Sequence, residues 1–172
     1  MKDVLIVVDM QKDFIDGSLG TKEAQAIVDN VKDKIECYLA EGKRVIFTKD
    51  THPENYLETY EGKHLPVTHC VKGSQGWEIF GVLPFDEKLC TVVEKGTFGY
   101  LDWKELLADV ADLEICGLCT DICVISNALI LRAIYPDKDI LVDAACCAGV
   151  TPELHEAALK VMASNQIEVI GT

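Results

Sequence analysis

The chain has 172 residues, and 29 acidic against 16 basic side chains give it a formal net charge of -13. This excess of negative charge argues against nucleic acid or an anionic membrane as a partner, because phosphate groups are bound by cationic surfaces. Hydrophobic residues make up 49% of the chain and no repeat or linker divides it, so we expect one globular domain over residues 1–172.

Short apolar runs rich in β-branched residues recur along the chain, at residues 4–8, 44–48, 90–93, 113–116, 139–142 and 167–170. Most are continuous rather than alternating, which is typical of strands buried on both faces of a parallel sheet. Helical patterns lie between them, at residues 21–40, 101–108, 121–134 and 152–164. This alternation predicts a doubly wound α/β fold with three layers, in which helices cover both faces of the sheet.

One interval breaks this rhythm. Residues 50–89 separate the second and third predicted strands, and we expect only one short helix there, after Pro53. A connection of this length in a compact domain is usually functional. Three of the four histidines lie within it: His52, His64 and His69.

Reactive side chains follow four of the predicted strands. They are Asp9 after the first, Lys49, Asp50 and His52 after the second, Glu94 and Lys95 after the third, and the cysteines of residues 116–123 after the fourth. In an open parallel sheet, ligands bind beyond the carboxyl ends of the strands. The sequence therefore predicts a functional site at this edge of the sheet.

Residues 116–124 read CGLCTDICV and allow several interpretations. A zinc knuckle needs a second spaced cysteine pair, which the chain lacks. A redox pair needs its first cysteine at a helix N-terminus, whereas Cys116 closes a predicted strand before Cys119. With Thr120 as the N-cap, Cys123 lies in the first turn of the next helix, where amide groups stabilise a thiolate. Cys123 is the best candidate nucleophile, and simple packing of small apolar thiols is the alternative.

A cysteine nucleophile needs a base, and Asp9 and Lys95 end strands that can neighbour the Cys123 strand. A strand-end carboxylate has its pKa raised by burial and lowered by a neighbouring lysine, so Asp9 can carry the proton. Taken singly, each of the two residues can also be an ordinary surface charge.

Asp50 and His52 are two residues apart, so in an extended chain they share a face and can bind one ion. Carboxylate and imidazole ligands together suit Zn²⁺, Fe²⁺ or Mn²⁺. The alternative is a polar loop whose histidines lie in solvent.

Five motifs match a known family, at residues 7–19, 48–56, 65–79, 93–100 and 117–124. Through them the chain resembles the isochorismatase-like cysteine hydrolases, and within that family the nicotinamidase group. The resemblance implies a six-stranded parallel sheet and a small-molecule amide substrate, nicotinamide, that is hydrolysed to nicotinate and ammonia in NAD salvage. Another amidase of the family, acting on a carbamoyl or ureido substrate, is the alternative, as is a thiol–disulfide protein of a different class.

The resemblance also implies the roles of particular residues. Asp9, Lys95 and Cys123 match the catalytic triad. The backbone N–H groups of Cys119 and Cys123 match the oxyanion hole, next to a cis peptide bond between Leu118 and Cys119.

One divalent metal ion is implied as a cofactor, with zinc the first expectation and iron or manganese the alternatives. Its ligands match Asp50, His52 and His69, and Glu61 is the expected fourth ligand with His64 as its rival.

Phe14 matches an aromatic residue that packs on the substrate ring, and we expect Leu65 and Tyr100 to contact the substrate as well. Leu65 departs from the family, because many members have an aromatic residue before the corresponding segment, and Val67 and Thr68 include an extra residue before the histidine. Eight cysteines without a secretion signal are typical of a reducing cytoplasm, and we expect a cytoplasmic homo-oligomer.

Overall fold

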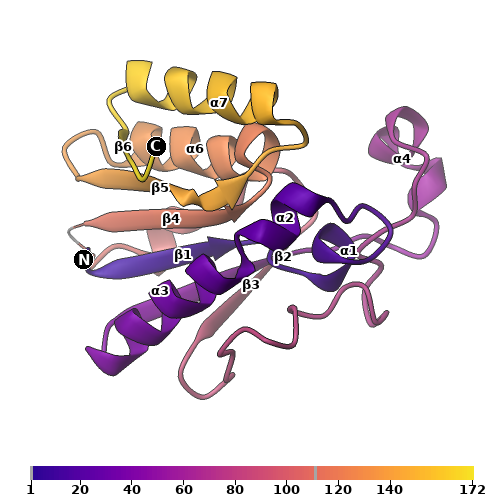
Figure 1. Cartoon of the computed structure of the whole chain (residues 1–172), viewed down its shortest axis with the longest axis horizontal. Coiled ribbons are helices and arrows are strands. Elements are labelled where there is room, and N and C mark those ends of the chain that lie inside the picture. Colours follow the sequence, from indigo (N-terminus) through magenta and orange to yellow (C-terminus); the bar gives the residue numbers. More distant parts are fainter. Residues whose placement is uncertain (1, 111) are drawn as a thin grey trace.

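A computed structural model describes residues 2–110 and 112–172 of the chain. Within these residues the strands form one parallel sheet in the order β3-β2-β1-β4-β5-β6 (Figure 1). Their bounds are Val4–Val8 (β1), Arg44–Asp50 (β2), Thr91–Lys95 (β3), Leu113–Leu118 (β4), Ile140–Ala148 (β5) and Glu168–Ile170 (β6). The expected six-stranded parallel sheet is confirmed.

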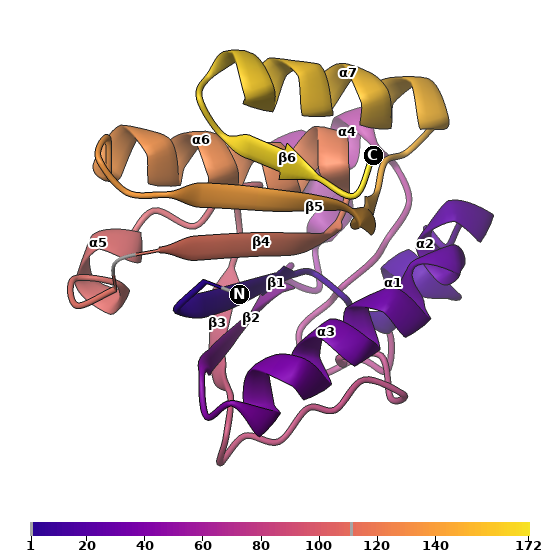
Figure 2. The ribbon, with the colours of Figure 1, turned by 60° about the vertical axis from the view of Figure 1, so that its left-hand side comes forward.

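Helices cover both faces of this sheet. Their bounds are Lys12–Ile15 (α1), Lys22–Ala26 (α2), Val28–Ala40 (α3), Tyr60–His64 (α4), Trp103–Leu106 (α5), Ile125–Ile134 (α6) and Pro152–Ser164 (α7), with one 3-10 turn at Tyr56–Glu58 (η1) and one π-helical turn at Thr120–Val124 (η2). α3 lies on one face and α6 and α7 lie on the other (Figures 1 and 2). The predicted three layers are confirmed, and none of the helices described here has the length and apolar character needed to cross a membrane.

β1 is the centre of the core. All five of its residues are 0% exposed, because β2 and β4 pair with its edges and helices cover its two faces. A strand in this position has no polar face to present, which explains the continuous run VLIVV.

Some elements differ from the sequence prediction. The helix expected over residues 21–40 is interrupted at Ile27, so that α2 packs on α1 while α3 continues along the sheet. β5 runs six residues further than predicted, to Ala148, through small residues with weak strand preference. Its last residues are held by pairing with β4, since Cys147 lies opposite Gly117. A short helix, α1, was not predicted.

The chain order places a crevice at the ends of β1 and β4. From β1 the chain passes to β2 and β3 on one side, and then returns to β4 on the other side of β1. In doubly wound sheets, ligands bind where the strand order reverses in this way, beyond the carboxyl ends of the strands. α1, α2 and α4 lie beyond the same ends (Figure 1).

Candidate active site

Asp9, Lys95 and Cys123 meet in the crevice. Lys95 Nζ lies 2.6 Å from Asp9 Oδ2 and 3.5 Å from Cys123 Sγ, and all three residues are buried. Asp9 has a φ of 46°, in the left-handed region that residues other than glycine rarely adopt. Such backbone strain is concentrated at functional sites, and here it turns the carboxylate into the crevice directly after β1.

Lys95 reaches the site in a way that its strand position did not predict. The expectation that β3 can neighbour β4 is wrong, because β2 and β1 lie between them. The long lysine side chain closes the distance across the ends of those two strands. On its way it passes Asp50, whose Oδ1 lies 3.4 Å from Nζ.

Burial and charge set the protonation of this group. Burial raises the pKa of Asp9, and the charge of Lys95 opposes that rise. Burial and then the Asp9 charge raise the pKa of the Cys123 thiol well above its usual value, although Lys95 opposes them. Burial alone would lower the pKa of Lys95, but the negative charges around it raise that pKa instead. Cys123 therefore rests as a thiol beside an acceptor carboxyl group and a fixed ammonium group.

The turn that carries Cys123 begins at a cis peptide bond between Leu118 and Cys119, as the resemblance implied. The expectation that Thr120 is the N-cap is wrong, because Cys119 holds that position. The Thr120 hydroxyl is instead hydrogen-bonded to His155 Nδ1 at 2.8 Å, so it is unavailable for capping. This contact ties the turn to α7.

The π-helical geometry of η2 changes the hydrogen bonding around the nucleophile. The N–H groups of Ile122 and Val124 both donate to the Cys119 carbonyl oxygen at 3.0 Å. Among the described residues, the Cys123 N–H does not donate to that oxygen. The Cys123 N–H therefore does not share the acceptor oxygen that binds the N–H groups of its two neighbours.

Cys116, another cysteine of the motif, has a different position from Cys123. Cys116 is an interior residue of β4 rather than its end, since the strand continues to Leu118. It is fully buried, and burial raises the pKa of its thiol well above the usual value. All eight cysteines are free thiols. Cys123 and Cys119 line the cavity described below, but Cys116 does not and is 0% exposed, so no redox partner can reach its sulfur.

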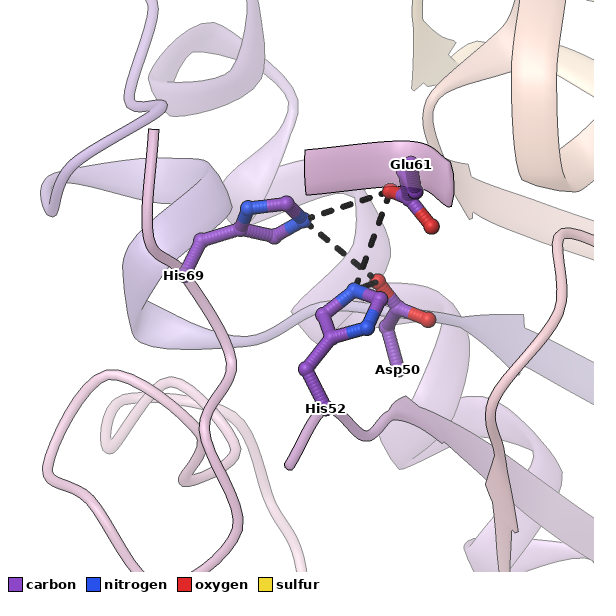
Figure 3. Close-up of side chains that lie close together, drawn as sticks. All are labelled: Asp50, His52, Glu61 and His69. Carbon is purple, nitrogen blue, oxygen red and sulfur yellow. Dashed lines mark hydrogen bonds and ion pairs between the residues drawn. The ribbon is translucent and has the colours of Figure 1, made fainter. Parts of the chain in front are cut away.

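Four side chains form a second cluster beside the crevice: Asp50, His52, Glu61 and His69 (Figure 3). One possible ligand atom from each lies within 4.8 Å of all the others. His52 Nε2 is 2.9 Å from Asp50 Oδ2, and His69 Nε2 is 3.7 Å from both Asp50 Oδ2 and Glu61 Oε1. Asp50 ends β2, His52 follows it, Glu61 lies in α4, and His69 lies in the loop after α4.

The chemistry of these four groups fits a divalent metal ion. The Nδ1 atom of His69 is 2.8 Å from the Val67 carbonyl oxygen, so Nδ1 carries a proton and Nε2 faces the cluster, where it would give up its own proton on binding a metal ion. Burial raises the pKa of Asp50, but hydrogen bonds from His52 and His69 outweigh it and hold that pKa below its ordinary range. An ionised carboxylate and neutral imidazoles are the ligands that Zn²⁺, Fe²⁺ and Mn²⁺ take.

His64, the rival of Glu61, lies apart from this cluster. It is exposed, its Nδ1 is 2.8 Å from the Tyr60 carbonyl oxygen, and its ring packs on the ring of Tyr60. Glu61 is thus the residue that the structure brings to the other three.

Gln11 and Asp13 position this cluster, and sequence reasoning did not single them out. The buried Gln11 amide accepts from the Asp50 N–H at 2.7 Å and donates to the Asp50 carbonyl oxygen at 2.9 Å, as an additional strand would. Asp13 Oδ2 accepts from the N–H of Cys70 at 2.8 Å, next to His69. Both residues belong to the motif at residues 7–19. Their polar side chains, directly after a strand predicted to be buried, are the signal that could have identified them.

A cavity of about 540 Å³ opens over both groups of side chains. Cys123, Asp50, His69 and Glu61 all line it. Of the expected substrate contacts, Phe14 and Leu65 line the cavity, and the Phe14 ring centroid is 5.5 Å from that of His69.

Tyr100 is not among the residues that line this cavity. Its ring packs edge-on against Trp103, and its N–H donates to Asn127 Oδ1. Phe98, two residues earlier, lines the cavity instead. The tight turn after Lys95 decides which of the two aromatic residues faces inward, and a sequence pattern does not contain that information.

Asn127 is a further residue that the sequence did not reveal. It is fully buried one turn after Cys123, and its amide donates to the Cys123 carbonyl oxygen at 2.8 Å and to the Phe98 carbonyl oxygen at 3.3 Å. Its oxygen accepts from the Tyr100 N–H at 2.9 Å and from Trp103 Nε1 at 3.0 Å. One side chain therefore joins the nucleophile turn to the loop that carries Phe98.

Fold and site together define an α/β enzyme with a buried Asp–Lys–Cys group beside a carboxylate–imidazole cluster. The model of the isochorismatase domain matches residues 3–172, and the chain belongs to this family.

Several proteins are similar along nearly the whole chain. The structure of pyrazinamidase of Pyrococcus horikoshii in complex with zinc is 28% identical, with a TM-score of 0.87 and full coverage of both chains. The nicotinamidase of Escherichia coli is 26% identical over 90% of this chain and 86% of its own. The structure of N-carbamoylsarcosine amidase from Thermoplasma acidophilum is 26% identical, with a TM-score of 0.78, and covers 98% of this chain and 95% of its own.

Proposed function

We propose that this amidohydrolase is a nicotinamidase, which hydrolyses nicotinamide to nicotinate and ammonia. The observation that carries the proposal is one cavity lined both by the candidate nucleophile Cys123 and by members of the metal-type cluster, Asp50, Glu61 and His69. A substrate with a reactive carboxamide and a metal-binding ring nitrogen suits both ends of that cavity. Similarity to named nicotinamidases and pyrazinamidases supports the same reading.

The first chemical step is proton transfer from Cys123 to Asp9. Asp9 Oδ2 forms a 2.6 Å ion pair with Lys95, and a carboxylate oxygen has a second lone pair, which can accept the thiol proton. The thiolate attacks the carboxamide carbon and forms a tetrahedral oxyanion. The N–H groups of Cys119 and Cys123 stabilise that oxyanion, a contribution of about 3 kcal/mol per donor.

The second half of the reaction reuses the same carboxyl group. Asp9 returns its proton to the departing nitrogen, so that ammonia leaves and a Cys123 thioester remains. Asp9 then takes a proton from water, which attacks the thioester and releases nicotinate. Lys95 keeps the charge of this region compensated throughout, because it lies within 3.5 Å of both reacting groups.

The cavity walls orient the ring. Phe14 and Leu65 supply apolar surface on which a pyridine ring can pack. A divalent cation held by Asp50, His52, Glu61 and His69 would bind the pyridine nitrogen and so fix the carboxamide against Cys123.

Nicotinamide and benzamide separate this proposal from its rivals. The experiment measures kcat/KM for both amides with metal-loaded enzyme, chelated enzyme and the His52→Ala variant. Chelation and His52→Ala should each lower kcat/KM for nicotinamide on the order of 10²–10³-fold, since ring orientation is lost. Benzamide, which has no ring nitrogen, should be a poor substrate in every form.

His64→Ala is the matched control, because His64 lines the same cavity but lies outside the ligand cluster. It should keep nicotinamide hydrolysis within about threefold. Equal losses for both amides would mean that the ion is structural. Efficient hydrolysis of a carbamoyl amino acid, with nicotinamide inert, would replace the proposal by the activity named for the Thermoplasma relative.

A further inference from the structure

The start of η2, the turn that carries Cys123, is hydrogen-bonded to α7 through side chains outside the cavity. The Thr120 hydroxyl lies 2.8 Å from His155 Nδ1, and neither residue is among those that line the cavity. Thr120 is fully buried, and His155 is half-buried near the start of α7. A substrate bound in the cavity therefore contacts neither side chain.

A second hydrogen bond joins the same two parts of the molecule. Asp121 Oδ1 accepts at 2.9 Å from the N–H of Val150, which lies between β5 and α7. Gly149 leaves room for this contact, because a Cβ there would lie 2.8 Å from the His155 backbone nitrogen and 2.9 Å from Asp121 Oδ1. The end of β5 and the start of α7 therefore support η2 directly.

His155 and Asn127 hold different ends of η2. Asn127 donates to the Cys123 carbonyl oxygen near the C-terminal end, whereas His155 bonds the first residue, Thr120. The two N–H groups that the proposed mechanism uses belong to Cys123 and to Cys119, which directly precedes Thr120. Such donors stabilise an oxyanion only when their positions are fixed before the reaction. The bond at the start of η2 is therefore next to one donor and three residues from the other.

We propose that His155 is a positioning residue for amide hydrolysis, which acts through the Thr120 hydroxyl to fix the start of η2 and so holds the two oxyanion donors in place. This inference rests on the proposed function, which supplies the oxyanion. Loss of the bond should slow the chemical step, because the donors are no longer fixed. It should leave substrate binding unchanged, because Phe14, Leu65 and the metal-type cluster line the cavity and His155 does not.

Matched variants separate the hydrogen bond from the packing around it. His155→Leu keeps a side chain of similar size but cannot form the bond, whereas His155→Asn places a polar atom near the position of Nδ1 and can form it. Thr120→Val and Thr120→Ser are the corresponding pair on the other partner. The experiment measures kcat and KM for nicotinamide with each metal-loaded variant, and the free energy of unfolding by urea denaturation.

His155→Leu and Thr120→Val should each lower kcat on the order of 10–10²-fold, less than the roughly 10²–10³-fold that follows loss of a whole oxyanion donor. KM should stay within about twofold, and His155→Asn and Thr120→Ser should keep kcat within about threefold of the wild type. A double variant with both His155→Leu and Thr120→Val should be no slower than the slower single variant, because both changes remove the same bond. The half-buried His155 pair decides the question if the fully buried Thr120→Val does not fold.

Alkylation of Cys123 by iodoacetamide, followed by mass spectrometry, is the control for the nucleophile itself. This reaction forms no oxyanion, so its rate should be the same in His155→Leu as in the wild type. An alkylation rate that falls as much as kcat, additive losses in the double variant, or unchanged kcat in His155→Leu would each overturn the inference and leave the proposed function standing. A wild-type protein that does not hydrolyse nicotinamide would overturn both.

Discussion

Replacing Asn127 tests whether one buried amide holds the nucleophile turn in place. Its four hydrogen bonds use its full capacity of two donors and two acceptors. Asn127→Ala leaves their partners behind: the carbonyl oxygens of Cys123 and Phe98, the N–H of Tyr100 and the indole N–H of Trp103. The Cys123 and Trp103 bonds are buried, whereas the other two are partly buried.

The expected cost follows from those two buried groups. Leaving a buried polar group without a partner costs about 1–3 kcal/mol, so two of them cost about 2–6 kcal/mol. We expect Asn127→Ala to lower the free energy of unfolding by about 3 kcal/mol, which a domain with about 5–15 kcal/mol of stability survives. Asn127→Asp keeps the accepting oxygen but, when ionised, cannot donate to Cys123 or Phe98, so it should lose a similar amount at neutral pH.

Urea denaturation measures these changes, and kcat/KM for nicotinamide measured below the unfolding transition reports on the turn itself. Asn30→Ala is the control, because exposed Asn30 also donates to a backbone carbonyl, that of Ala145, at 2.8 Å. It should cost less than about 1 kcal/mol. An Asn127→Ala protein within 1 kcal/mol of the wild type, with unchanged kcat/KM, would refute the reasoning.

Three further predictions concern the nucleophile, the proton carrier and the strand that leads to them. Cys123→Ala should abolish nicotinate formation while Cys116→Ala keeps it, and the reverse pattern would overturn the assignment. Asp9→Asn should fold and bind metal but hydrolyse nicotinamide at least about 10²-fold more slowly, since an amide cannot carry the proton; turnover near the wild-type rate would contradict this role. Gly117→Ala should cost about 3 kcal/mol or more in urea denaturation, because φ is +116° and a Cβ would clash with the Val8 carbonyl oxygen of β1. Gly81→Ala, where a Cβ would meet nothing within 4 Å, should cost little.

Residues that follow buried strands could be placed from the sequence because local pattern determines them. Continuous apolar runs identify strands buried on both faces, and the ends of parallel strands meet at one edge. That reasoning brought Asp9, Asp50, Lys95 and Cys123 to the same edge without any knowledge of strand order. The bounds of α7 were also predicted, since Pro152 begins a clear helical periodicity.

Only the tertiary structure decided how those residues reach one another. The sequence does not state that two strands separate Lys95 from Cys123, because strand order depends on how the helices pack on the two faces. The turn after Lys95 places Phe98 rather than Tyr100 at the cavity wall, and Asn127 is hydrogen-bonded to both residues of that turn. Asn127 is close to them in space but distant in sequence. Contacts of this kind carry no periodic signal. The sequence therefore reveals the reactive residues at the strand ends, and the packed fold adds Phe98 and Asn127 and sets the distances, partners and protonation of the site.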